Sequence, residues 1–122
     1  MMTQKPASVL VVEDEALLLL VIAEDLRDAG YVVFEASNAD QAIAQLELHP
    51  EISILFTDVD MPGSMDGLRL SAAVRDRWPP IKIIVTSGKR VPEDRALPGG
   101  SVFMPKPYTP SSVASTIRQL LD

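Results

Sequence analysis

Short apolar runs alternate with longer helix-forming stretches along this chain, and this alternation constrains the fold more than any other feature. The apolar runs have the length of buried strands and lie at 8–12, 31–35, 52–57, 81–85 and 101–104. The stretches that predict helices lie at 15–29, 41–48, 67–78 and 111–121. Strands that alternate with helices are typical of parallel βαβ units, so the sequence predicts an α/β fold.

Residues at the ends of the predicted helices support these boundaries. Gly30 stands where a glycine commonly ends a helix, and Asn38 or Asp40 can cap the second one. The pair Pro79–Pro80 cannot continue a helix, and Pro110 suits the first turn of the last one. At least one end of each predicted helix therefore carries a local signal.

The segment Gly88–Gly100 interrupts the alternation between the fourth and fifth strands. Pro92, Pro98 and the pair Gly99–Gly100 leave room for one helical turn, near 93–97. We therefore expect the fourth helix to be short or irregular, and this crossover to be the most mobile part of the chain.

The composition favours one soluble domain. A chain of 122 residues is long enough for a single core, and we expect one domain over 1–122 with an ordered core at about 7–121. The net charge of −6 argues against nucleic-acid binding, and the absence of cysteine excludes disulfides and thiolate zinc sites. Acidic residues at 13–15 interrupt the apolar stretch 9–23, so neither a membrane span nor a signal peptide is predicted. We expect a cytoplasmic protein.

Charged and hydroxyl side chains follow four of the predicted strands. Glu13 and Asp14 come after the first strand, Asp58 ends the third, Thr86–Ser87 end the fourth, and Lys106 follows the fifth. In open α/β sheets, ligands bind outside the carboxyl ends of parallel strands, where these side chains would converge. The sequence therefore predicts a metal and phosphate site at that edge of the sheet.

Four motifs carry these residues: VVED at 11–14, DVDMP at 58–62 with DG at 66–67, IVTSG at 84–88 and MPKP at 104–107. Together they resemble the receiver domain of bacterial two-component response regulators, over essentially the whole chain. The resemblance implies a flavodoxin-like (βα)5 fold with an open five-stranded parallel sheet in the order 2-1-3-4-5. It also implies that Asp58 accepts a phosphoryl group from a histidine, on a sensor histidine kinase or a histidine phosphotransfer protein.

The three acids of the predicted site favour Mg²⁺ as the cofactor. Two carboxylates about 4 Å apart repel each other by roughly 1 to 4 kcal/mol, and a cation removes that repulsion. Mg²⁺ prefers oxygen ligands and also coordinates phosphate oxygens. We expect the carboxylates of Asp14 and Asp58 and the backbone carbonyl of Asp60 to bind it, with Glu13 acting through a water. Alternatively, Glu13 and Asp14 are solvated acids at the start of the first helix.

Phosphoryl transfer needs a nucleophile and groups that neutralise the charge on the phosphoryl oxygens. Asp58 is the predicted nucleophile, and the Lys106 ammonium and the Thr86 hydroxyl are predicted to bind phosphoryl oxygens. The alternatives without a functional role are that Lys106 is a solvent-exposed lysine before a turn and that Thr86 is an ordinary strand residue.

The resemblance also implies a switch built from Thr86 and Phe103. Thr86 moves toward the new phosphoryl group, and Phe103 on the fifth strand rotates into the space behind it. The surface that reads this change would comprise the fourth crossover, the fifth strand and the last helix. Alternatively, Phe103 is only a core residue.

The first helix combines a predicted core stripe with predicted exposed leucines. We expect the stripe that docks on the sheet to consist of Leu18, Val21, Ile22, Leu26 and Ala29. Leu17 and Leu20 lie off that stripe, and with Pro107 and Tyr108 they are predicted to dock the kinase, as the resemblance suggests. Single exposed leucines are also common without any partner, and Tyr108 could simply pack.

The chain departs from the family pattern in its Asp58 loop, which is one residue longer than usual, and in its second acid, Asp60, at a position that tends to tune phosphoryl lifetime. We expect no effector domain to follow, and we therefore expect output by contact with a downstream protein and no turnover of external substrates. Two alternatives remain. One is a receiver-like scaffold that binds regardless of phosphorylation. The other is a Mg²⁺-dependent aspartyl phosphatase of the haloacid dehalogenase type. In that family the Asp-x-Asp pair follows the first strand, whereas in this chain Asp58 and Asp60 follow the third predicted strand.

Overall fold

The computed structural model describes residues 6–61, 63, 65–88 and 100–121. Their elements follow in the order β1 (Ser8–Val12), α1 (Ala16–Asp28), β2 (Val32–Ala36), α2 (Ala39–Leu48), β3 (Ile52–Asp58), α3 (Gly67–Arg77), β4 (Lys82–Ser87), β5 (Val102–Pro105) and α4 (Pro110–Leu121). Every predicted strand and helix that falls on these residues is confirmed, with bounds that differ by at most two residues.

The five strands form one parallel sheet in the order β2-β1-β3-β4-β5, which confirms the predicted fold. The register aligns the carboxyl ends of the central strands: Val12 pairs with Thr57, and Asp58 pairs with Thr86. Residues that follow these strands in the sequence therefore emerge at one edge of the sheet.

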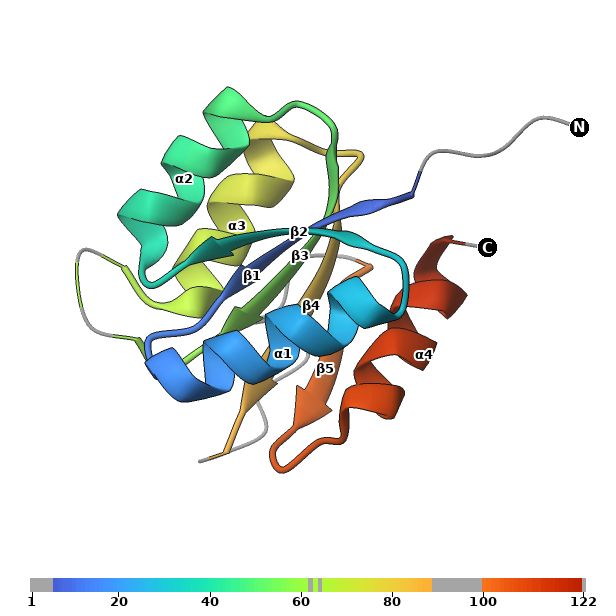
Figure 1. Ribbon diagram of the computed structural model, residues 1–122. Coiled ribbons are helices and arrows are strands. Elements are labelled where there is room, and N and C mark those ends of the chain that lie inside the picture. The colour runs from blue at the N-terminus through green and yellow to red at the C-terminus, as the bar shows by residue number, and fades with distance from the viewer. Residues whose placement is uncertain (1–5, 62, 64, 89–99, 122) are drawn as a thin grey trace, which may run out of the picture.

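Helices cover both faces of this sheet, α2 and α3 on one side and α1 and α4 on the other (Figure 1). The central strands are consequently buried on both faces, which explains why they read as continuous apolar runs in the sequence. One core cluster includes Leu46, Leu70 and Val74 from α2 and α3, and the other includes Leu26 and Ile117 from α1 and α4.

The stripe predicted for α1 is partly wrong. Val21 is 43% exposed and Ala29 is exposed, whereas the residues of α1 that are buried against the sheet are Leu19, Ile22, Ala23 and Leu26. Four successive leucines at 17–20 give no unique helical period, so the sequence does not fix the helix rotation. Ala29 caps the helix instead of continuing its face.

Local contacts at the helix ends agree with the predicted signals. The Asn38 side chain accepts a hydrogen bond from the Gln41 N–H at 2.9 Å, so Asn38 rather than Asp40 caps α2. Asp66 caps α3 in the same way by accepting from the Arg69 N–H at 2.9 Å. Gly30 adopts a φ of 101°, which favours glycine after α1. The helices α1, α2 and α3 thus each begin or end at a capping side chain or at a glycine.

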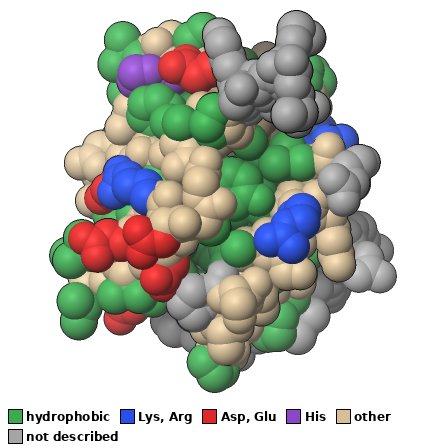
Figure 2. Space-filling model, turned by 45° about the vertical axis from the view of Figure 1, so that its right-hand side comes forward, with side chains coloured by type: hydrophobic (Ala, Val, Ile, Leu, Met, Phe, Trp, Pro, Cys, Tyr) green, Lys and Arg blue, Asp and Glu red, His purple; other side chains and the backbone are tan. Residues whose placement is uncertain are grey.

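The face in Figure 2 carries hydrophobic side chains between groups of acidic and basic ones. Among the residues described, no helix has both the length and the apolar character needed to cross a membrane. The predicted irregular fourth helix and the mobility of that crossover concern 89–99, which lie outside the described residues.

Candidate phosphoryl and metal site at the carboxyl edge of the sheet

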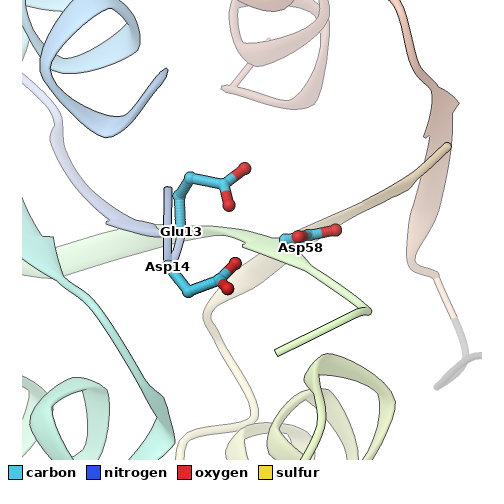
Figure 3. Close-up of side chains that lie close together, drawn as sticks. All are labelled: Glu13, Asp14 and Asp58. Atoms are coloured by element: carbon cyan, nitrogen blue, oxygen red, sulfur yellow. The ribbon is translucent and has the colours of Figure 1, made fainter. Parts of the chain in front are cut away.

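Three carboxylates meet where β1 and β3 end. Glu13 and Asp14 follow β1, Asp58 is the last residue of β3, and one oxygen of each lies within 4.8 Å of the others. Figure 3 shows the side chains of Glu13 and Asp14 extending from the end of β1 toward Asp58. Glu13 and Asp58 are both only 3% exposed, whereas Asp14 is exposed. The predicted acidic cluster is therefore present, with two of its members removed from water.

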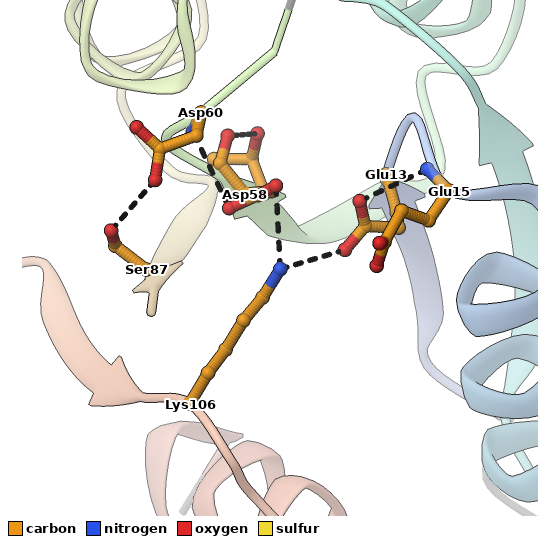
Figure 4. A network of polar contacts seen from close by, with 7 residues as sticks. Glu13, Glu15, Asp58, Asp60, Ser87 and Lys106 are labelled. Atoms are coloured by element: carbon orange, nitrogen blue, oxygen red, sulfur yellow. Dashed lines mark hydrogen bonds and ion pairs between the residues drawn. The ribbon is translucent and has the colours of Figure 1, made fainter. Parts of the chain in front are cut away.

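Lys106 brings a positive charge to this cluster from the end of β5. Its Nζ lies 3.2 Å from Glu13 Oε1 and 3.4 Å from Asp58 Oδ2, so the ammonium bridges the two buried acids (Figure 4). The backbone N–H of Lys106 donates to the Ser87 carbonyl at 3.1 Å, which extends the pairing of β5 with β4 by one residue. This hydrogen bond fixes the position of the Lys106 backbone, from which the side chain extends to the acids.

The buried charges have shifted pKa values. Burial raises the pKa of Glu13 from its ordinary 4.5 to about 7, against a hydrogen bond from the Glu15 N–H. Burial also raises the pKa of Asp58, although the Lys106 ammonium acts to lower it. For Lys106, burial acts to lower the pKa, but the charges of Glu13 and Asp58 outweigh it and raise the pKa. The acids are thus costly to ionise together without a cation.

The backbone around Asp58 is held from two sides. The Val59 N–H donates to the Thr86 carbonyl at 2.9 Å, and the Gly67 N–H donates to the Val59 carbonyl at 2.9 Å. A Cβ at Gly67 would collide with the backbone carbonyl of Asp58, so this close approach of α3 requires glycine. The start of α3 therefore fixes the position of the carboxyl end of β3.

Thr86 lies beside Asp58 on the neighbouring strand, in direct register. Its side chain is fully buried, and its hydroxyl has no hydrogen-bond partner among the residues that the structure describes. Buried hydroxyls without a partner are uncommon because they cost free energy. Phe103 on β5 is half-buried and packs against the core cluster on the α2 and α3 side.

A pocket of about 240 Å³ opens above these groups. Its lining comprises Asp14, Glu15, Asp58, Asp60, Gly88 and Lys106. The pocket therefore presents carboxylate oxygens and one ammonium to the same small volume, which suits a cation and a phosphoryl group together.

The family model for the response regulator receiver domain matches residues 9–118. The chain belongs to this family. The match covers the acidic pairs, the hydroxyl pair and the lysine that converge at the sheet edge.

Curated relatives agree with this family assignment. The chain is 37% identical to the sensor kinase CckA of Brucella abortus over 95% of this chain and 13% of that protein. It is 34% identical to the transcriptional regulatory protein PdtaR of Mycobacterium tuberculosis over 92% of this chain and 55% of that protein. The chain thus spans about half or less of these two curated relatives.

Two solved structures are similar over almost their whole length. The receiver domain of the hybrid histidine kinase CckA has a TM-score of 0.81 and 32% identity, covering 94% of this chain and 99% of that one. A receiver protein from Sinorhizobium medicae has a TM-score of 0.88 and 28% identity, covering 98% and 97%. The molecule is a receiver domain of two-component response regulators.

The sequence did not predict the contact between Ser87 and Asp60 in this receiver. The Ser87 hydroxyl donates to Asp60 Oδ2 at 2.9 Å. The sequence marks Ser87 only as a residue at a strand end, and Asp60 chiefly through its backbone carbonyl. The available signal is the pairing of β3 with β4, which brings Ser87, the last residue of β4, close to Asp60, two residues after β3.

The predicted docking residues lie around the first turn of α1 and after β5. Leu17 is 74% exposed and Leu20 is 48% exposed. Pro107 is exposed, and Tyr108 places its ring edge on Phe56 with the ring centres 5.5 Å apart. A pocket of about 380 Å³ between the two regions is lined by Leu18, Gly88, Lys106, Pro107 and Tyr108.

Proposed function

We propose that this receiver takes a phosphoryl group onto the Asp58 carboxylate from a phosphohistidine, with Mg²⁺ as cofactor, and signals through a phosphorylation-dependent protein contact. The observation that carries the proposal is the placement of Asp58. It ends a central strand, is 3% exposed, and lies 3.4 Å from the Lys106 ammonium beside two further acids. A carboxylate in this setting is aimed at a ligand, not at water.

The donor set fits Mg²⁺. All three clustered groups are carboxylates, the hard oxygen ligands that this ion prefers. The carboxylates of Asp14 and Asp58 and the backbone carbonyl of Asp60 would hold the ion, with Glu13 beside them. When bound, the ion would neutralise the acids and one oxygen of the phosphoryl group.

Asp58 supplies the nucleophile for the transfer. One carboxylate oxygen attacks phosphorus and forms the O–P bond of an acyl phosphate, while the N–P bond of the phosphohistidine breaks and the imidazole nitrogen keeps the electron pair. The Lys106 ammonium, already 3.4 Å from Asp58 Oδ2, neutralises charge on a phosphoryl oxygen. The buried Thr86 hydroxyl donates to another, which gives a partner to a group that has none among the described residues.

The same hydroxyl supports a switch. If Thr86 moves toward the phosphoryl group, it leaves space on the β5 side, and the half-buried Phe103 is the aromatic side chain placed to fill it. The change would be read by a downstream protein on the surface of β5 and α4, while the part of the predicted surface at 89–99 lies outside the described residues. Because Phe103 has no hydroxyl, it would signal through packing alone.

We assign the docking of the phosphohistidine-bearing partner to Leu17, Leu20, Pro107 and Tyr108. These residues flank the acidic pocket, and a groove of about 510 Å³ along Leu17 and Val21 adjoins them. An amphipathic helix of the partner kinase or phosphotransfer protein could pack its apolar face there. Leu17→Ser should then slow transfer from the partner without slowing transfer from a small donor.

Intact-protein mass after incubation with phosphoramidate and Mg²⁺ tests the proposal. Wild type is expected to gain one phosphoryl group, and the gain should vanish on chelation and in Asp58→Asn. No gain with any donor, together with undetectable Mg²⁺ binding, would leave the phosphorylation-independent scaffold as the better explanation. Turnover of small phosphate esters would instead favour the aspartyl phosphatase, which the family match does not support.

A further inference from the structure

Ser87 ties the end of β4 to the loop that follows the acceptor strand. The residue is 4% exposed, and its hydroxyl donates to Asp60 Oδ2 at 2.9 Å. Figure 4 shows the Asp60 carboxylate turned toward Ser87 and away from the Lys106 ammonium. This direction is notable because an ammonium would be the stronger partner for a carboxylate.

Asp60 is close enough to matter to the reacting group. It follows Asp58 by two residues, its N–H lies 3.4 Å from Asp58 Oδ1, and both residues line the same pocket. A carboxylate that swung over Asp58 would meet an incoming phosphoryl group as a like charge. At short range in a pocket of intermediate polarity, such a repulsion would slow the transfer severalfold.

The Ser87 hydroxyl is well placed to prevent that swing because its own position is fixed. The Ser87 carbonyl accepts from the Lys106 N–H at 3.1 Å, and the carbonyl of the preceding Thr86 accepts from the Val59 N–H at 2.9 Å. Both neighbouring strand ends therefore hold the backbone of this residue. Asp60 is exposed, so its side chain depends on such a contact for a fixed direction.

We propose that Ser87 is a positioning residue that keeps the Asp60 carboxylate against β4 and out of the path of the phosphoryl group. The proposal rests on the proposed function, because it concerns the rate at which Asp58 is phosphorylated. Ser87 touches no reacting atom and acts through Asp60. Its effect must therefore depend on the charge of Asp60.

The initial rate of Asp58 phosphorylation by phosphoramidate and Mg²⁺ tests this dependence. Ser87→Ala should be slower than wild type by about fivefold, which corresponds to about 1 kcal/mol of added repulsion. In an Asp60→Asn background, which removes the charge and keeps the side-chain size, adding Ser87→Ala should change the rate less than about twofold. Ser87→Thr, which keeps the hydroxyl, should restore most of the wild-type rate.

Two further measurements separate positioning from a structural role. The deficit of Ser87→Ala should shrink as salt is raised, because salt screens the repulsion. Ser53→Ala serves as the matched control, since this serine lies at the opposite end of β3 and its hydroxyl contacts the Ser8 carbonyl. It should react like wild type. Ser87→Cys, with a weaker donor of similar size, should fall between wild type and Ser87→Ala, which keeps the test open if the alanine variant unfolds.

An equal deficit for Ser87→Ala in both Asp60 backgrounds, or no deficit at all, overturns the proposal. If wild type and Ser53→Ala are themselves not phosphorylated, the proposed function fails, and the role of Ser87 falls with it. The two failures are distinct because the second appears in the control protein.

Discussion

The pKa of the Glu13 carboxyl group is set by the burial of this side chain at the end of β1. Its carboxyl group is 3% exposed, and its pKa in the folded chain is about 7, compared with 4.5 ordinarily. The folded protein therefore keeps a proton that the unfolded chain releases. Such a group contributes stability that is fully present below its unfolded pKa and is lost as the pH rises through its folded pKa.

We therefore expect the metal-free protein to lose stability as the pH rises from about 5 to about 8, by on the order of 2 kcal/mol. The raised pKa of Asp58 acts in the same direction, whereas Lys106 keeps its charge throughout this window. Urea unfolding across the window measures the effect, and Glu13→Gln should flatten the dependence. The same slope in wild type and Glu13→Gln would contradict the assignment.

Gly67 cannot be replaced by a residue with a side chain unless the neighbouring backbone moves. Because a Cβ would collide with the Asp58 carbonyl, Gly67→Ala must displace either the start of α3 or Asp58 itself. We expect a loss of roughly 2 to 4 kcal/mol in the free energy of unfolding and slower phosphorylation. Ala72→Gly on the exposed side of α3 is the control: it should cost about 1 kcal/mol through helix propensity and leave the phosphorylation rate unchanged.

Among the elements, β2 carries the risk of an open sheet edge. The Val32 N–H and the Ala36 carbonyl bond toward the β1 side, at 3.0 Å each, so the carbonyls of Val33 and Glu35 face outward. Arg27 donates to the Val33 carbonyl at 3.0 Å, and Gln45 donates to the Glu35 carbonyl at 2.9 Å. Side chains of α1 and α2 thus occupy the acceptors that another strand would use.

The double variant Arg27→Ala/Gln45→Ala should therefore self-associate more than wild type, because it frees two carbonyls on the edge strand. Light scattering over a range of protein concentrations measures this. Arg69→Ala removes one exposed cation from α3 without touching β2, and it should scatter like wild type. Equal scattering by all three proteins would mean that the edge is protected in another way.

The elements were predictable from the sequence where burial alone decides them. The strand β4 reads as an apolar run because both of its faces are covered. The helix α3 (Gly67–Arg77) ends before Pro79 and Pro80, which cannot continue a helix. The rotation of α1 was not predictable, since a run of four leucines offers several equivalent faces. Which one is buried depends on the sheet and on α4, which lie far away in the chain.

At the scale of the whole molecule, the candidate site was predictable in its members and not in its contacts. Asp58 and Lys106 stand at strand ends, and a parallel sheet brings strand ends together. The bridge from Lys106 to Glu13 and the hydrogen bond from Ser87 to Asp60 depend on side-chain directions across strands. No local pattern in the sequence contains that information.

On the proposed function, Mg²⁺ binding would link the site to the stability of the entire domain. The three carboxylates come together only in the folded chain, so an ion that binds them stabilises the folded state. We expect Mg²⁺ at about 100 times its dissociation constant to raise the free energy of unfolding by about 2.7 kcal/mol. Thermal unfolding with and without Mg²⁺ measures the gain, which should largely disappear in Asp14→Asn and persist in Asp76→Asn on α3. A gain that survives Asp14→Asn would place the ion elsewhere.

The order of the strands along the chain has a consequence for synthesis. Asp58 leaves the ribosome well before Lys106, and the two groups meet only after β5 has docked beside β4. A nascent chain that ends within β4 therefore has all the acids but lacks the ammonium that faces them. On the proposed mechanism, a kinase can phosphorylate Asp58 only after the whole domain has been made and folded. Incompletely synthesised copies therefore do not consume phosphoryl groups.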